Sequence, residues 1–167
     1  TKLCIPTGLD SVMEAPGRVY EFLFQPGEIT IIPQDNYVRH IYTDGRKRTD
    51  HPKLSFNGES LGHWEGQVLV VETAALLPEG EFIHGVRTGP ASADMRIVER
   101  FYLADKDKLR VDTTMYSDVA FTKPYTRTMN YRRVPFPVAE EICTQNNRDL
   151  DAGGNQIFNT TPPPLKN

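Results

Sequence analysis

The chain has 167 residues, of which 19 are lysine or arginine and 22 are aspartate or glutamate, so its formal net charge at pH 7 is −3. A chain of this length suits one domain that can bury a full core. Because the charges are nearly balanced and form no long basic run, nucleic acid is excluded as the main partner. No apolar run approaches the roughly 20 residues of a membrane span, so we expect none.

The first half of the chain predicts β-strands separated by turns. Gln25-Pro26-Gly27 is a turn signal. Asp44-Gly45 predicts a two-residue hairpin turn, with the basic residues 46–48 at a solvated hairpin tip. We expect residues 46–62 to be loop because they are polar. The runs with strand patterning are residues 18–24, 28–32, 36–43 and 67–73.

The second half contains the clearest strand pair. Residues 94–103 and 109–116 are rich in β-forming residues and are joined by Ala-Asp-Lys-Asp-Lys, which predicts a β-hairpin. A further strand is expected from residue 125 to 134. Proline and glycine predict a long irregular loop over residues 74–93, and a short helix fits only within residues 137–150.

These elements predict an all-β fold with little helix. We expect an antiparallel, closed or nearly closed barrel of about eight strands, lipocalin-like or similar, whose interior can hold one small ligand. A β-sandwich is the alternative. The domain is expected to cover residues 1–150, followed by an irregular C-terminal tail over residues 151–167, where Gly-Gly and Pro-Pro-Pro occur.

Two acids stand in or beside apolar strand stripes. Alternation places Glu99 in the middle of an inner face. The strand 67–73 is apolar on both faces, so the face that carries Glu72 is left open. A buried carboxylate must pair or raise its pKa. Glu99 can therefore pair with Arg127 or Arg39 across the sheet, or serve as a general acid or base.

Other candidate groups are more dispersed. His40 and Tyr42 share one strand face and could act as a general base with a phenol donor, although a lone strand histidine is often only a satisfied polar residue. The four histidines lack metal-ligand spacing, so no metal site is expected. No nucleophile or phosphate-loop motif is present. Cys4 and Cys143 are either free and buried or joined as one disulfide.

Several motifs occur together in a recognisable order. They are CIPTG at residues 4–8, IYTDGR at 41–46, GHWEGQVLVVET at 62–73, MRIVERF at 95–101, YTRTMNY at 125–131 and EEICTQNNRD at 140–149. Their order resembles a large group of mostly uncharacterised, exported bacterial proteins with a pattern of DGR, GxWEGDTLVVET, VERF and a late cysteine followed by Glu-Asn.

The resemblance implies a location more than an activity. It implies a periplasmic or secreted protein and favours a disulfide between Cys4 and Cys143. The sequence itself contains no recognisable signal peptide. The chain departs from the group where His63 replaces arginine and Gln67 replaces aspartate, and where Gln145-Asn146 replaces Glu-Asn. His40 is also unusual at its position, which draws attention to both histidines.

The leading functional hypothesis is a cofactor-independent acid/base enzyme of isomerase, dehydratase or cyclase type, acting on a hydrophobic small molecule in the barrel cavity. The alternative is a non-catalytic carrier of a small apolar ligand, and the fold alone does not choose between them. A homodimer is possible, and no cofactor is expected. The predicted catalytic residues are Glu99, Glu72, His40 and Tyr42, and the predicted substrate-binding residues are Trp64, Phe101, Met115, Arg127, Tyr131 and His63.

Overall fold

The computed structural model describes Leu9 and residues 18–33, 38–77, 81–83, 86–87 and 94–138, with only the backbone described for 81–83 and 86–87. All of these belong to one compact unit, Pro6–Glu141. Cys4, Cys143 and the tail 151–167 lie outside the described residues, as does most of the segment 137–150 in which a helix was considered. The disulfide therefore stays a prediction.

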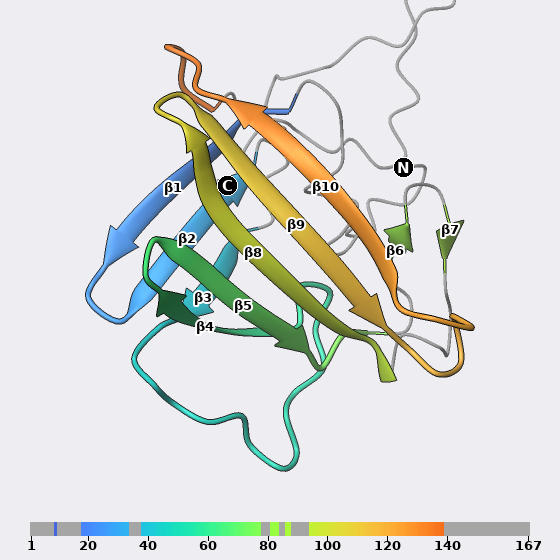
Figure 1. Ribbon diagram of the computed structural model, residues 1–167. Helices are drawn as coiled ribbons and strands as arrows, with labels where there is room; N and C mark the ends of the chain where they lie inside the picture. Colours follow the sequence, from blue (N-terminus) through green and yellow to red (C-terminus); the bar gives the residue numbers. More distant parts are fainter. Residues whose placement is uncertain are drawn as a thin grey trace, which may run out of the picture. The chain divides into compact units, whose positions relative to one another are not determined.

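The regular secondary structure of the described residues is almost entirely β-strand, so the all-β expectation is confirmed (Figure 1). Each strand ends at a turn or loop, as the alternation and turn signals predict. The strands are β1 (Tyr20–Gln25), β2 (Glu28–Pro33), β3 (Arg39–Tyr42), β4 (Glu59–Glu65), β5 (Val68–Ala74), β6 (Glu81–Ile83), β7 (Val86–Arg87), β8 (Arg96–Asp105), β9 (Lys108–Tyr116) and β10 (Tyr125–Arg132).

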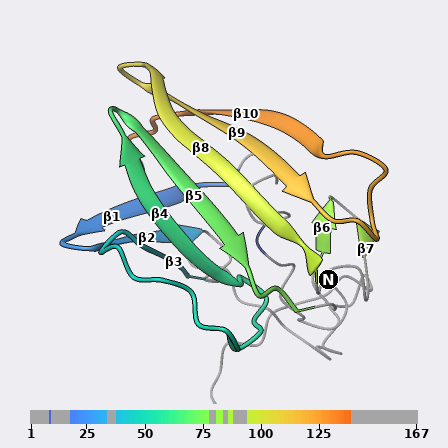
Figure 2. The same ribbon diagram turned by 60° about the horizontal axis from the view of Figure 1, so that its bottom comes forward.

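Eight of these strands form one curved sheet in the order β1-β2-β3-β4-β5-β8-β9-β10, while β6 and β7 pair separately. The sheet arches into an open half-barrel (Figure 2). Among the described residues, the edge strands β1 and β10 make no backbone ladder with each other. The expectation of closure is therefore wrong in its strict form, because this sheet keeps two edges.

One strand pair departs from the expected antiparallel pattern. β3 runs parallel to β4, with Ile41 opposite Ser60 and Tyr42 opposite Leu61. Parallel neighbours need a crossover connection rather than a tight turn, and residues 43–58 provide it. Asp44-Gly45 consequently forms no hairpin between β3 and β4, and residues 59–62, expected as loop, form the start of β4.

The hairpin of β8 and β9 is confirmed, with Ile97 opposite Met115 and Phe101 opposite Val111. The preceding hairpin of β4 and β5 turns at Gly66, whose φ of 61° lies in the left-handed region that glycine adopts without a steric penalty. These two hairpins place the WEG motif at a turn and the apolar run after it in the middle of the sheet.

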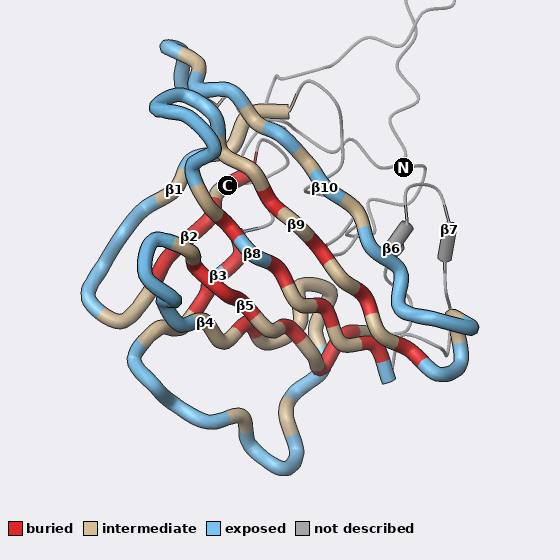
Figure 3. The backbone as a smooth tube through the Cα atoms, in the orientation of Figure 1, coloured by how far each residue is buried: buried red, intermediate tan, exposed pale blue. Residues whose placement is uncertain are grey.

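The core lies on the concave face of the sheet, where buried residues alternate with more exposed ones along β8 and β9 (Figure 3). This alternation confirms the predicted inner face of β8, including buried Glu99. Most of the buried apolar residues form two clusters. The smaller cluster contains Leu9, Leu76, Met95, Ile97 and Met115. The main cluster contains Ile29, Ile31, Ile41, Leu69, Val71, Phe101 and Val111, with Tyr20, Phe22, Leu109 and Tyr131 packed against it.

Candidate functional site

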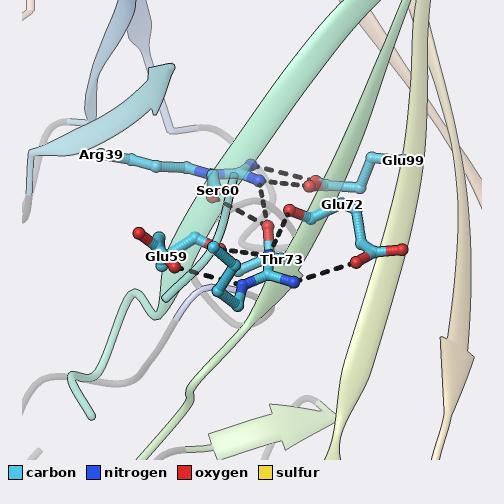
Figure 4. A network of polar contacts seen from close by, with 7 residues as sticks. Arg39, Glu59, Ser60, Glu72, Thr73 and Glu99 are labelled. Atoms are coloured by element: carbon cyan, nitrogen blue, oxygen red, sulfur yellow. Dashed lines mark hydrogen bonds and ion pairs between the residues drawn. The ribbon is translucent and has the colours of Figure 1, made fainter. Parts of the chain in front are cut away.

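Glu99 on β8 is paired with an arginine from β3, three strands away in the same sheet. Its side chain is 3 % exposed and that of Arg39 is 4 % exposed. Arg39 Nη1 donates to Glu99 Oε1 at 3.1 Å, and Nη2 donates to Oε2 (Figure 4). A bidentate pair satisfies a buried carboxylate without requiring it to be protonated. Of the alternatives for Glu99, pairing with Arg39 is therefore confirmed.

Two hydroxyl groups complete the surroundings of this guanidinium. Arg39 Nε donates to Ser60 Oγ at 3.1 Å, and Nη2 donates to Thr73 Oγ1 at 3.0 Å. The two hydroxyl oxygens lie 2.8 Å apart and share a further hydrogen bond. Arg39 thus joins β3 to β4, β5 and β8 inside the core. This network has the character of a structural clamp, because its polar groups are turned toward one another.

Glu72 occupies the outer face of β5, which settles the parity that the sequence left open. Arg48 Nη1 donates to Glu72 Oε1 at 3.0 Å, and Arg96 Nη1 donates to Oε2 at 3.2 Å. Arg48 also lies 3.2 Å from Glu59 and donates to the backbone carbonyl of Glu72, which fastens the crossover segment to β4 and β5. Glu72 is therefore bound by two guanidinium groups.

His40 and Tyr42 lie together on the outer face of β3, as their shared parity predicts. His40 Nδ1 lies 2.6 Å from Oε1 of Glu28 on β2. The His40 and Tyr42 rings stack with centroids 6.5 Å apart, and the Arg46 guanidinium lies 3.8 Å from the Tyr42 centroid. The hydrogen bonds from His40 and then Thr30 hold the pKa of Glu28 below its usual range. An ionised Glu28 can orient the His40 ring.

The crossover segment forms a hollow beside this pair, which we call the crossover groove. Its volume is about 560 Å³. His40 and Tyr42 line it from β3, and Lys53 and Phe56 line it from the crossover segment. Predicted Glu72 is not among its lining residues. The groove results directly from the parallel pairing, since only a crossover brings residues 49–58 alongside β3.

A larger hollow, which we call the edge groove, lies where β1 and β10 face each other without pairing. Its volume is about 710 Å³. The Tyr20 and Tyr131 rings meet edge to face there, with centroids 5.6 Å apart. Tyr131 is the one predicted substrate-binding residue in its lining. The apolar and aromatic lining residues are Val19, Tyr20, Phe22, Leu103, Leu109, Met129, Tyr131, Val134, Phe136, Pro137 and Val138.

The remaining predicted binding residues do not gather at either groove. Phe101 and Met115 are buried in the two core clusters. Trp64 lies beside the β4–β5 turn and is 52 % exposed. His63 is also exposed and lies 3.3 Å from Glu65, while Arg127 lies on β10 opposite Thr113. Period-two reasoning placed these residues on faces, but it could not reveal which faces remain open.

Tyr20, Phe22, Leu109 and Met129 are groove residues that the sequence reasoning missed. Tyr20 and Phe22 belong to β1 at one end of the strand order, while Met129 belongs to β10 at the other end and Leu109 to its neighbour β9. No local pattern shows that these two ends of the sheet approach each other. The available signal was weak: the alternating apolar positions of β1 and β10 were recognisable as strand faces.

A scan against family models finds no match to this chain, and searches of curated proteins and of solved structures also find none.

Within the described part of the chain, no group of three or more histidine, cysteine, aspartate or glutamate side chains is arranged to hold a metal ion. None of the described residues forms a helix with the length and apolar character needed to cross a membrane.

Proposed function

We propose that this protein binds and carries a hydrophobic small molecule in the edge groove. The observation that carries the proposal is the groove itself, about 710 Å³ in volume and lined mainly by apolar and aromatic side chains. Volumes of roughly 300–1,000 Å³ and a predominantly apolar lining are typical of small-molecule sites. The groove opens between β1 and β10, which do not pair with each other, so a ligand can enter without any strand of the sheet separating from its neighbour.

The placement of the buried charges supports a carrier. Glu99 has both carboxylate oxygens engaged by Arg39, and Glu72 is engaged by Arg48 and Arg96 on the other face. Neither acid lines the edge groove. The groove therefore offers mainly contact with apolar and aromatic side chains, rather than a buried carboxylate for proton transfer.

A groove-filling variant tests the carrier. The wild-type protein should increase the fluorescence of the apolar probe N-phenyl-1-naphthylamine, and Met129→Trp should weaken that binding by about tenfold or more because it removes space for roughly one buried apolar group. Val119→Trp is the matched control, since Val119 is 74 % exposed and is not among the groove residues. Equal probe affinity in the wild type and Met129→Trp, with native circular dichroism, would contradict the assignment.

The second candidate is the acid/base enzyme, and one observation favours it. His40 lies 2.6 Å from Glu28 and lines the crossover groove with Tyr42. A carboxylate that holds Nδ1 leaves Nε2 to exchange a proton with a substrate, the arrangement of a general base. Glu99 and Glu72 have no catalytic part in this version, because their positions and partners separate them from His40.

The enzyme candidate has its own test. Elimination of 5-nitrobenzisoxazole requires a general base, and catalysis by His40 should exceed that of an equal concentration of imidazole. His40→Gln should remove the excess, whereas His63→Gln should keep it because His63 is exposed outside the crossover groove. A wild-type rate no higher than that of imidazole would exclude His40 as a base for this class of reaction.

A further inference from the structure

Large apolar side chains are exposed at the mouth of the edge groove. Leu103 and Phe136 both line the groove, yet they are 65 % and 56 % exposed. Leu103 lies at the end of β8, beside the β8–β9 turn, and Phe136 follows the end of β10. Single exposed apolar residues are common, but a cluster around a groove marks an interaction site.

Basic side chains accompany these apolar ones. Four of the six charged residues that line the groove are basic, namely Arg18, Lys106, Arg132 and Arg133, while Glu21 and Asp107 are acidic. This excess is local, because the whole chain has a net charge of −3.

Ion pairing neutralises only part of the basic charge at the mouth. Asp107 lies 3.4 Å from Arg133, and Asp105 lies 3.9 Å from Lys108. Lys106 and Arg132 have no ion-pair partner among the described residues. Two cations thus remain available beside the exposed leucine and phenylalanine.

This surface continues along one rim of the sheet. The rim is formed by the β1–β2, β4–β5 and β8–β9 turns, which lie along one side of the sheet (Figure 1). Exposed Phe24 and Trp64 lie beside the first two of these turns. Aromatic side chains that project from turns are suited to the boundary between lipid headgroups and acyl chains, where tryptophan is enriched.

We propose that this rim docks on a lipid surface containing anionic headgroups, with the mouth of the edge groove toward the bilayer. Leu103 and Phe136 would enter the headgroup boundary while Lys106 and Arg132 contact lipid phosphates. A protein partner would need no such combination of a groove for an apolar molecule and unpaired cations at its mouth. The inference rests on the proposed carrier function, because it makes the bilayer the source or destination of the carried molecule.

Vesicle flotation tests the docking. Wild-type protein should float with vesicles of phosphatidylcholine and phosphatidylglycerol and bind pure phosphatidylcholine much less. Since each basic residue near an anionic surface contributes about a fivefold change in affinity, Lys106→Gln/Arg132→Gln should weaken binding about 25-fold. Leu103→Ser/Phe136→Ser should weaken it about tenfold or more through lost apolar burial.

The opposite end of the sheet provides matched controls. Lys123→Gln and Val119→Ser change the same kinds of exposed side chain in the segment between β9 and β10, and both should float like the wild type. Equal flotation of all variants, or no flotation of the wild type, would overturn the docking.

Probe binding without vesicles separates the two proposals. Wild-type protein that binds N-phenyl-1-naphthylamine but does not float refutes the docking and leaves the carrier intact. Protein that floats but does not bind the probe refutes the carrier, and with it the role of docking in ligand transfer.

Discussion

The buried pair of Arg39 and Glu99 permits a quantitative prediction. Arg39→Met leaves a carboxylate that is 3 % exposed without either of its guanidinium donors, and it also removes one donor each from Ser60 and Thr73. Removing one partner of a buried ion pair costs about 3–5 kcal/mol. For a chain of this length, each kcal/mol corresponds to about 2–4 °C in Tm. We therefore expect a fall in Tm of about 6–20 °C.

Two comparisons separate the pair from ordinary side-chain loss. Arg39→Met/Glu99→Leu should be more stable than Arg39→Met, because an apolar replacement of both partners leaves neither charge buried alone. Glu72→Gln should cost less than about 1 kcal/mol, because its pairs with Arg48 and Arg96 are partly exposed to solvent. The side chain of Glu72 is 44 % exposed, against 3 % for Glu99.

Urea unfolding followed by circular dichroism measures these differences, provided that the dependence on urea concentration has the same slope for each protein. The reasoning would be refuted if Arg39→Met and Glu72→Gln cost the same, or if the effects of Arg39→Met and Glu99→Leu were simply additive. Additivity would mean that the two side chains do not interact in the folded protein.

Two further predictions concern two glycines with positive φ and the loss of stability at low pH. Gly66→Ala should lower the free energy of unfolding by about 1–2 kcal/mol, because its positive φ alone disfavours a side chain. Gly58→Ala should lower it by about 1–3 kcal/mol more, because the added Cβ would lie 2.4 Å from the Ala74 carbonyl oxygen. Urea unfolding measures both losses, and equal losses would contradict this reasoning. The pKa of Asp112 is lowered chiefly by its hydrogen bond from Thr128. The stability that ionised Asp112 gives the folded protein is therefore complete above about pH 4 and is lost as pH falls through the folded pKa. The difference in unfolding free energy between the wild type and Asp112→Asn should shrink over that fall, and a constant difference would contradict the assignment.

The environment of Glu99 shows what alternation can predict. Period two placed this acid on the inner face of β8, and the cost of an isolated buried charge required a partner. Arg39 and Arg127 were both named as partners, and the structure identifies Arg39. The choice depends on the parallel pairing of β3 with β4, which follows from chain contacts far apart in sequence rather than from any local pattern.

The grooves were less accessible to sequence reasoning for the same reason. Tyr131 was expected to bind a ligand, but its partner Tyr20 lies more than a hundred positions earlier and at the other end of the strand order. The start of β4 at Glu59 was assigned to loop because its composition is polar. Its strand conformation comes from hydrogen bonding to β3 and β5, a tertiary effect that overrides weak local propensity.

The buried ion pair also bears on why β3 adopts one register. β3 has four residues, and only two residue pairs define its parallel alignment with β4. A one-residue slip would turn Arg39 outward and leave Glu99 buried without its guanidinium. We infer that the pair selects the register of β3, and we expect Arg39→Met/Glu99→Leu to fold with more than one set of amide NMR signals for β3. A single sharp set with wild-type contacts between Thr30 and His40, which are cross-strand partners, would show that the hydrophobic pattern alone determines the register.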